Sequence, residues 1–199
     1  FEGERPGVKV AFNFDGSSAL VDQLAAGAPA DVLATADEKN MTRAVDAKVV
    51  SGTPRVFATN VLTLVVPAGN PARITGLDAS LAGKKLVICA VGVPCGNATE
   101  TLAKNLGATL KPVSTEQKVT DVLGKVTSGE ADAGIVYTTD AAAAGDKVQA
   151  VAIPGSEKVV NRYPVAATAA AKDAGLAAAF ADYVTGEQGR AVLAEFGFG

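Results

Sequence analysis

Three short stretches of the sequence place hydrogen-bond donors directly ahead of apolar residues at helical spacing. They are FDGSSAL (14–20), GVPCGNAT (92–99) and STEQKVT (114–120). A helix that begins there leaves up to four backbone N–H groups without intrahelical partners. The helix dipole adds about half a positive charge at the same end, so such a turn can hold an anion. Because serine caps are routine at helix starts, each turn alone has two interpretations, an ordinary cap or part of an anion site.

The composition argues against several other kinds of site. The 199 residues contain no histidine, so they hold neither a Ser-His-Asp nor a Cys-His arrangement and lack the commonest zinc ligand. The sequence shows no clustered carboxylate pair and no phosphate loop of the form G-x-x-x-x-G-K-[ST]. A net charge of -3 and an aromatic content of 5% without Trp disfavour a nucleic-acid surface. No apolar run approaches the roughly 20 residues that span a bilayer.

The two cysteines, Cys89 and Cys95, leave two alternatives open. They are too few for a structural zinc site, and their spacing differs from a redox C-x-x-C motif. They either form one disulfide, which fits an exported protein, or remain a buried thiol on a strand and an unpaired cysteine.

The apolar pattern alternates between strands and helices. We expect strands at 8–14, 30–36, 60–67, 84–91, 133–139, 147–154 and 162–170. We expect a helix capped by Ser17 or Ser18 and ended by Gly27, a helix capped by Asp37, and a turn followed by a helix within 93–107 that Gly107 ends. We also expect helices over 116–128 and over 176–196, the latter with a break at Gly186 or Gly189. This alternation predicts parallel sheets covered on both faces, with ligands bound beyond the carboxyl ends of strands. The start at Phe1, without Met, favours a processed or truncated product.

Six motifs occur in a specific order: GAPADV (27–32), TADEKNM (35–41), NVLTLVVP (60–67), VPCG (93–96), GIVYTTDA (134–141) and YPVA (163–166). Together with the ending GEQGRAVLAEFGF, they resemble the periplasmic molybdate-binding proteins of molybdenum ABC transporters over essentially the whole chain. The resemblance implies an α/β fold of the type II periplasmic-binding-protein class. In that fold, two lobes, each a mostly parallel sheet flanked by helices, are joined by two crossing strands that serve as a hinge. The expected division is 1–66 with 166–199 for lobe 1, lacking the family's first strand and helix with a ligand serine, and 67–165 for lobe 2.

The resemblance also implies a site built from neutral donors. It assigns the ligand contacts to the Ser17 hydroxyl, the main-chain amides of Cys95 and Val119, and the Tyr137 hydroxyl. Supporting roles fall to Asp15, Gly16, Ser18 and Gly96. A disulfide between Cys89 and Cys95 would pin the second turn to its strand and pre-organise the Cys95 amide.

Asp15 departs from the small neutral residues that are common at its position in the family. Its carboxylate has three interpretations. It accepts a hydrogen bond from a protonated oxyanion, it repels a dianion, or it faces outward and supports the turn.

The expected function is that of an extracytoplasmic solute-binding protein that captures molybdate or tungstate between its lobes and delivers it to ABC permease subunits. The expected protein is a monomer without cofactor, without catalysis and without direct coordination of metal by side chains; whether a lipid anchors it stays open. One alternative is a sulfate- or phosphate-binding protein of the same fold. An alternative of another class is a small-anion-sensing or enzymatic domain on the same scaffold.

Overall fold

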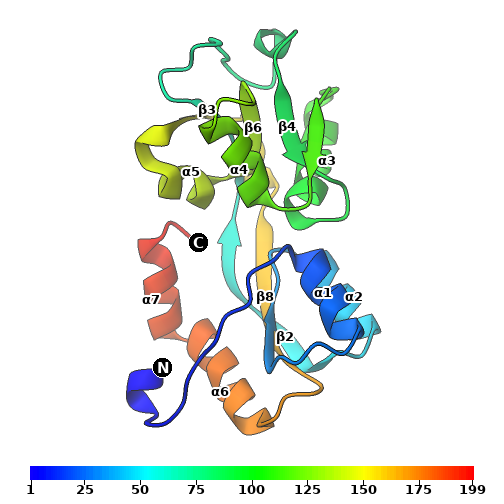
Figure 1. Ribbon diagram of the computed structural model, residues 1–199, viewed down its shortest axis with the longest axis vertical. Coiled ribbons are helices and arrows are strands. Elements are labelled where there is room, and N and C mark those ends of the chain that lie inside the picture. Colours follow the sequence, from blue (N-terminus) through cyan, green and yellow to red (C-terminus); the bar gives the residue numbers. More distant parts are fainter.

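The computed structural model describes residues 1–199 and divides into two lobes, one above the other (Figure 1). The lower lobe contains a three-stranded sheet of order β1-β8-β2, and the upper lobe a five-stranded sheet of order β5-β4-β6-β3-β7. The strands are β1 Val32–Ala34, β2 Val50–Asn60, β3 Leu62–Pro67, β4 Leu86–Cys89, β5 Ser114–Glu116, β6 Ala133–Tyr137, β7 Val148–Val151 and β8 Asn161–Thr168. The helices are α1 Ser17–Ala25, α2 Glu38–Asp46, α3 Pro94–Leu106, α4 Val119–Thr127, α5 Thr138–Ala144, α6 Ala174–Thr185 and α7 Glu187–Glu195.

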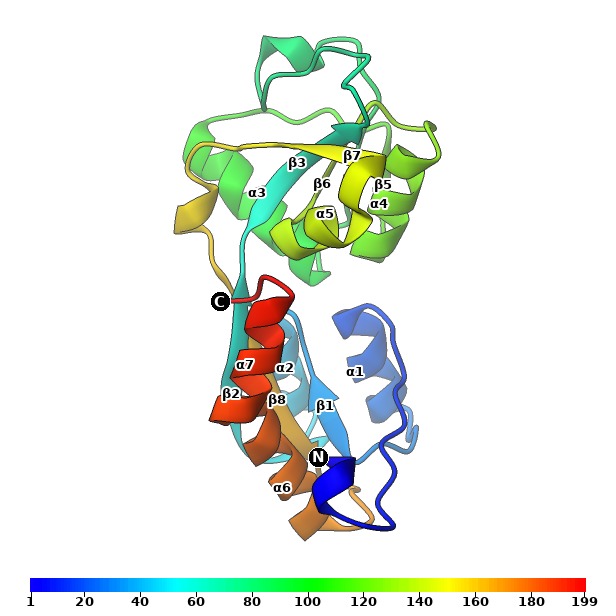
Figure 2. The ribbon, with the colours of Figure 1, turned by 90° about the vertical axis from the view of Figure 1, so that its left-hand side faces the viewer.

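The sheets are less parallel than the alternating pattern predicts. In the upper sheet β4 pairs in parallel with β5 and β6, whereas β3 is antiparallel to both β6 and β7. Both pairings in the lower sheet are antiparallel. The prediction of a mostly parallel sheet was therefore wrong for the lower lobe. The reason is that β2 leaves this lobe and β8 re-enters it, so that the two strands lie side by side but run in opposite directions (Figure 2).

The chain crosses between the lobes at two places. Only Val61 separates β2 in the lower sheet from β3 in the upper sheet, and residues 152–160 lead from β7 back to β8. At this crossing Asn60 is paired with Asn161 across the ladder. The chain thus passes from one sheet to the other at Val61 and again before Asn161. Both positions lie a few residues before the lobe boundaries expected after 66 and after 165. The long strand β2 was not predicted, because Gly52 and Pro54 interrupt its apolar pattern.

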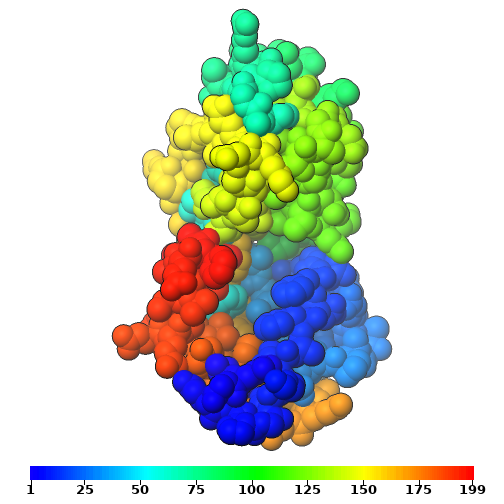
Figure 3. All heavy atoms as spheres, turned by 60° about the vertical axis from the view of Figure 1, so that its left-hand side comes forward, coloured from blue at the N-terminus to red at the C-terminus, as the bar shows by residue number.

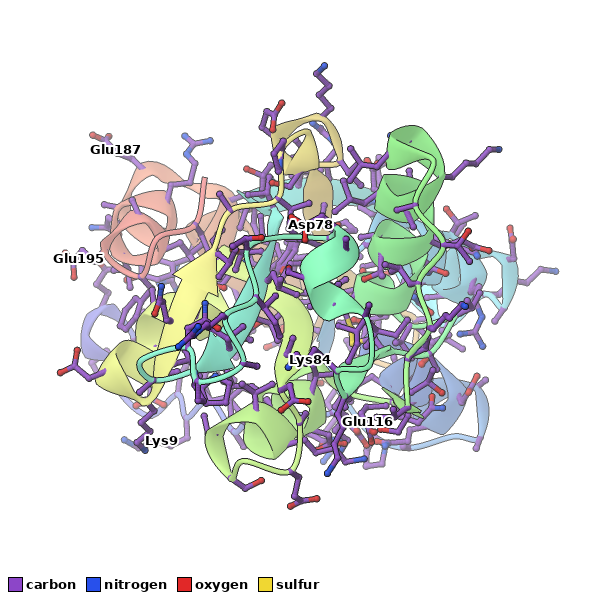
Figure 4. The ribbon with its side chains drawn as sticks, turned by 90° about the horizontal axis from the view of Figure 1, so that it is seen from above. Lys9, Asp78, Lys84, Glu116, Glu187 and Glu195 are labelled. Atoms are coloured by element: carbon purple, nitrogen blue, oxygen red, sulfur yellow. A yellow bond between two sulfur atoms is a disulfide. The ribbon has the colours of Figure 1, made fainter.

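The hydrophobic core is concentrated in the upper lobe. One cluster of 22 buried residues surrounds β3, β4 and β6, while a cluster of five lies in the lower lobe beneath α1 and α2. The helices α6 and α7 extend the lower lobe, and in the view from above Glu187 and Glu195 of α7 lie on the opposite side of the molecule from Glu116 of β5 (Figure 4). None of the helices combines the length and apolar character that a membrane span needs.

Several local signals are confirmed. The Asp37 carboxylate accepts a hydrogen bond from Asn40 N–H and caps α2, Gly107 ends α3 in the left-handed conformation, and Gly186 separates α6 from α7. The helix expected over 116–128 begins only at Val119, because residues 114–116 pair with β4 as strand β5.

The strand expected over 8–14 is absent. This segment is extended, but no neighbouring strand lies beside it to form a ladder. Its anchor is a 2.7 Å hydrogen bond from Val10 N–H to the Glu2 carboxylate. Phe12 and Phe14 are 67% and 84% exposed and stack on each other with ring centroids 5.5 Å apart. The alternating pattern therefore does not mark a half-buried strand here.

Candidate functional site

A cavity of about 260 Å³ lies between the two lobes. The space-filling view shows the molecule hollowed at its waist, where the two lobes meet (Figure 3). Residues of both lobes line the cavity: Phe14, Asp15, Gly16, Ser17, Ala36, Val93, Pro94, Cys95, Gln117, Lys118, Val119, Thr120 and Tyr137. The structure therefore brings together the four predicted ligand residues, far apart in sequence, along with Asp15 and Gly16. Ser18 and Gly96 do not line the cavity.

Three helices begin at this cavity, as the donor-rich turns predicted. The residues that precede α1, α3 and α4 are Gly16, Val93 and Lys118, and none of them caps its helix with a side-chain hydrogen bond. The N–H groups of Cys95 and Val119 donate to no protein acceptor. These amides are thus available to a ligand, and the helix dipoles favour a negative charge beside them.

The prediction that Ser17 or Ser18 caps α1 was wrong, because neither serine does so. Gly16 occupies the cap position. The Ser17 Oγ instead accepts a 3.0 Å hydrogen bond from Ala36 N–H, on the turn that follows β1. This contact holds a buried hydroxyl at the cavity wall.

Two glycines permit close approaches that position these helices. A Cβ atom on Gly16 would lie 2.8 Å from the carbonyl oxygen of Gln117, so the two lobes meet backbone to backbone at this point. A Cβ atom on Gly96 would lie 1.8 Å from the carbonyl oxygen of Ala90, directly after β4. Gly96 therefore acts from behind the cavity, because it lets α3 start against the end of the strand.

The two cysteines form a disulfide. It joins Cys89, the last residue of β4, to Cys95 in the first turn of α3. Of the two alternatives left by the sequence, the bonded one is present. The link ties the turn that carries the Cys95 amide to the buried sheet.

Tyr137 ends β6 and lines the cavity. The residue is 4% exposed, and its Oη accepts a 2.8 Å hydrogen bond from Asn161 Nδ2. Burial, together with the nearby Tyr163 and Asp37, raises the pKa of Tyr137 well above its ordinary value. The hydroxyl therefore keeps its proton and remains a donor.

Asp140 lies behind Tyr137, and its Oδ2 accepts a 3.0 Å hydrogen bond from the Tyr137 N–H. Burial raises the pKa of Asp140 to about 6, although that hydrogen bond partly offsets the effect. Tyr137 therefore holds the Asp140 carboxyl group in place through its backbone N–H.

Two charged side chains flank the cavity, and only one was singled out in the sequence. Lys118 Nζ lies 2.8 Å from Asp15 Oδ1 and pairs with it across the lobes. Asp15 also accepts a 2.8 Å hydrogen bond from Gly16 N–H and a 3.1 Å one from Gln23 Nε2. The hydrogen bond to Lys118 lowers the pKa of Asp15, and the same contact raises the pKa of Lys118. The carboxylate thus supports its turn, while its charge is balanced by a lysine that no sequence signal had marked.

A second group of interlobe contacts involves Asn97 and Asn40. Asn97 Nδ2 donates to Asp37 Oδ2 at 3.0 Å, Lys39 Nζ donates to Asn97 Oδ1 at 3.2 Å, and Asn40 Nδ2 donates to Gly92 O at 3.3 Å. These three contacts between the lobes are polar, whereas Tyr137 of β6 and Tyr163 of β8 pack ring against ring across the same boundary with centroids 5.9 Å apart.

Comparison with known proteins adds an independent observation. Residues 1–199 match the family described as bacterial extracellular solute-binding protein. Over 199 residues the chain is 43% identical to the molybdate-binding protein ModA of Mycobacterium tuberculosis, covering 100% of this chain and 76% of that protein. It is 36% identical to ModA of Escherichia coli over 207 residues, covering 96% of this chain and 79% of the relative. The periplasmic molybdate-binding protein of Azotobacter vinelandii has the same fold, with a TM-score of 0.83 at 21% identity over 99% of this chain and 90% of that one.

Proposed function

The chain belongs to the family of bacterial extracellular solute-binding proteins, and on that premise we propose that it captures molybdate outside the cytoplasm for an ABC permease. Tungstate, which has the same charge and shape, is the second ligand of the proposal. The observation that carries it is the convergence of unpaired amides from separate helix starts and two hydroxyl groups at one interlobe cavity.

The chemistry of the proposed contacts suits a fully ionised oxyanion. Such an ion offers hydrogen-bond acceptors and no donor, and the assigned groups on Ser17, Cys95, Val119 and Tyr137 can all donate. The proton of a protonated oxyanion would find no acceptor in the two amides, and the one carboxylate in the lining, Asp15, is already paired with Lys118. A buried polar group left without a partner costs about 1–3 kcal/mol, or roughly 5- to 150-fold in affinity.

The charges around the cavity also support an anionic ligand. The Asp15 carboxylate is neutralised by Lys118, so it does not leave an uncompensated negative charge at the entrance. The helix dipoles then supply the favourable electrostatic contribution.

In the proposed cycle, the lobes close on the ion by bending at the crossing between β2 and β3 and at the start of β8. The closed form is the one that permease subunits recognise. The protein works as a monomer, it alters no bond of the ligand, and the contacts to the ion are hydrogen bonds rather than metal coordination by side chains.

Melting temperatures test the proposal. We expect molybdate and tungstate to raise the melting temperature at matched ionic strength, since a ligand at 100 times its dissociation constant adds about 2.7 kcal/mol of stability. Sulfate and phosphate at equal concentration are the controls. A larger shift with sulfate or with phosphate would show that this ion, rather than molybdate, is the ligand. No shift with any of the four ions would contradict an oxyanion site.

A further inference from the structure

We propose that Asn161 is a positioning residue that turns the Tyr137 hydroxyl into an obligate donor toward the bound anion. The inference rests on the proposed function, because it concerns how the same cavity selects oxyanions without a proton. Asn161 begins β8 at the crossing between the lobes and is 6% exposed. It does not line the cavity.

The orientation of the Asn161 amide is fixed by its partners. Its Nδ2 lies 2.9 Å from the carbonyl oxygen of Ala36, and a carbonyl oxygen only accepts hydrogen bonds. The NH₂ group, rather than the amide oxygen, must therefore face Ala36, which settles the choice between the two flipped forms. The same nitrogen lies 2.8 Å from Tyr137 Oη.

The second proton of this NH₂ group determines what the Tyr137 hydroxyl can do. An amide NH₂ donates and does not accept, so Tyr137 Oη must accept from Asn161. Its own O–H proton is then left for another acceptor. The neighbouring Tyr163, whose ring centroid lies 5.9 Å from that of Tyr137, carries a competing hydroxyl group, but a doubly charged oxyanion is the stronger acceptor because hydrogen bonds to ionised groups are roughly twice as strong as neutral ones.

The Ser17 hydroxyl group is oriented in the same way, and Ala36 is again involved. Its Oγ accepts from Ala36 N–H at 3.0 Å, and a backbone N–H can only donate. The Ser17 proton is thus also left for another acceptor. Ala36 therefore joins both hydroxyl groups, since its N–H faces Ser17 and its carbonyl oxygen holds the amide that faces Tyr137. The hydroxyl groups of Ser17 and Tyr137 are thus both set as donors by a donor-only group behind them.

This arrangement gives Asn161 a role in selectivity. With both hydroxyl protons directed to the ligand, an oxyanion with four unprotonated oxygens satisfies the site. Hydrogen phosphate brings a proton that the two amides cannot accept, and each of the two hydroxyl oxygens already accepts one hydrogen bond from the protein. If the Tyr137 hydroxyl were free to rotate, it could accept that proton and the discrimination would weaken.

The test is Asn161→Asp, which keeps the shape of the side chain but replaces the donor by an acceptor. A carboxylate accepts the Tyr137 proton and turns it away from the cavity, so we expect molybdate affinity to fall by about 10- to 150-fold at pH 8. We also expect the ratio of molybdate affinity to hydrogen phosphate affinity to fall. A merely structural defect would weaken both ions alike and leave the ratio unchanged, and that result would overturn the proposal.

The matched control is Asn60→Asp. Asn60 lies opposite Asn161 in the ladder and is 5% exposed. Its Nδ2 donates to Thr139 Oγ1 at 2.7 Å and to Tyr163 Oη at 3.4 Å, and it makes no hydrogen bond with Tyr137. This variant introduces the same charge at the same crossing, and we expect it to leave the affinity ratio unchanged. An equal change of the ratio in both variants would refute a specific role for Asn161.

A double-mutant cycle with Tyr137→Phe provides a second readout. In the Tyr137→Phe background there is no hydroxyl to orient, so the loss caused by Asn161→Asp must shrink. The same loss in both backgrounds would refute the proposal.

Asn161→Leu, which removes the donors without adding charge, replaces Asn161→Asp if the Asn161→Asp protein does not fold. If the wild-type protein prefers sulfate, the proposed function fails. The ratio of sulfate affinity to hydrogen phosphate affinity, measured in the same variants, then still tests the role of Asn161.

Discussion

Ser17 and Ser18 are adjacent residues of α1 with different surroundings. Ser17 is buried at the cavity wall and accepts from Ala36 N–H, whereas Ser18 does not line the cavity. We therefore expect Ser17→Ala to weaken molybdate binding by roughly 5- to 150-fold, the range for leaving buried partners unsatisfied. Isothermal titration calorimetry measures the change.

Ser18→Ala is the matched control for this prediction, because it removes the same hydroxyl group one position along the same helix. We expect its affinity to equal that of the wild type. Equal affinities for all three proteins would show that the ligand does not bind at this turn.

Asp140 predicts a pH dependence of stability. Burial raises the pKa of its carboxyl group to about 6 in the folded protein, and the unfolded chain has the ordinary value near 3.9. Between these values the folded state holds a proton that the unfolded state has released. The contribution of Asp140 to stability therefore declines as pH rises through this window, and above pH 6 the folded protein contains a buried charge.

Asp140→Asn removes this charge and keeps an oxygen that can accept from the Tyr137 N–H. We expect the variant to be more stable than the wild type at pH 7.5, by up to about 3 kcal/mol, with the difference shrinking toward pH 4. Urea unfolding at several pH values measures it. Asp146→Asn, at an exposed carboxylate just after α5, is the control and should show no such trend, and a constant offset for Asp140→Asn would contradict the argument.

At the scale of elements, the position of α3 depends on Gly96. A methyl group there would collide with the carbonyl oxygen of Ala90 at 1.8 Å, so α3 would have to move away from the end of β4. We expect Gly96→Ala to destabilise the protein by about 1–3 kcal/mol and to weaken ligand binding as well, since the Cys95 amide moves with the helix. Denaturant unfolding and calorimetry together measure both effects.

Gly124→Ala in α4 is the matched control for the Gly96 prediction. A Cβ atom on Gly124 would meet no other atom within 4 Å, and alanine is favoured over glycine in a helix by roughly 1 kcal/mol. We expect equal or higher stability and unchanged affinity. A Gly96→Ala protein that behaves like Gly124→Ala would refute the close-approach explanation.

At the scale of the whole molecule, the pair of Asp15 and Lys118 joins the lobes across the cavity entrance. The lowered pKa of Asp15 and the raised pKa of Lys118 keep both groups charged through the neutral range. The ion pair holds the lobes together above the pKa of Asp15 and below that of Lys118, and it is lost as the pH falls through the pKa of Asp15. We expect Asp15→Asn to increase the radius of gyration of the ligand-free protein, as small-angle scattering would measure.

Asp22→Asn is the matched control, since Asp22 pairs with Arg43 at 2.7 Å within the lower lobe. Removal of that pair leaves the contact between the lobes intact, so the radius of gyration should not change. A larger radius in both variants, or in neither, would contradict a specific role for the interlobe pair.

Sequence reasoning located the donor-rich turns because their signals are local. A glycine or proline ahead of an apolar repeat marks a helix start, and this holds for α1 and α3, while α4 begins after the polar run that ends in Lys118. The ordered motifs indicated the family and the four proposed ligand residues. The same local signals misassigned the segment 8–14, since alternation of side chains does not supply the neighbouring strand that a ladder requires.

The amino-acid sequence by itself indicated the three turns at which these helices begin, to within a few residues, and that the chain lacks the groups for nucleophilic catalysis by a Ser-His-Asp site. Only the tertiary structure decided that the helix starts converge, that Lys118 neutralises Asp15, and that Asn161 faces the Tyr137 hydroxyl. The physical reason is distance along the chain: Asp15 and Lys118 are brought together by the two crossings between the lobes. A hydrogen bond or ion pair between such residues depends on the packing of whole lobes, which no local pattern encodes.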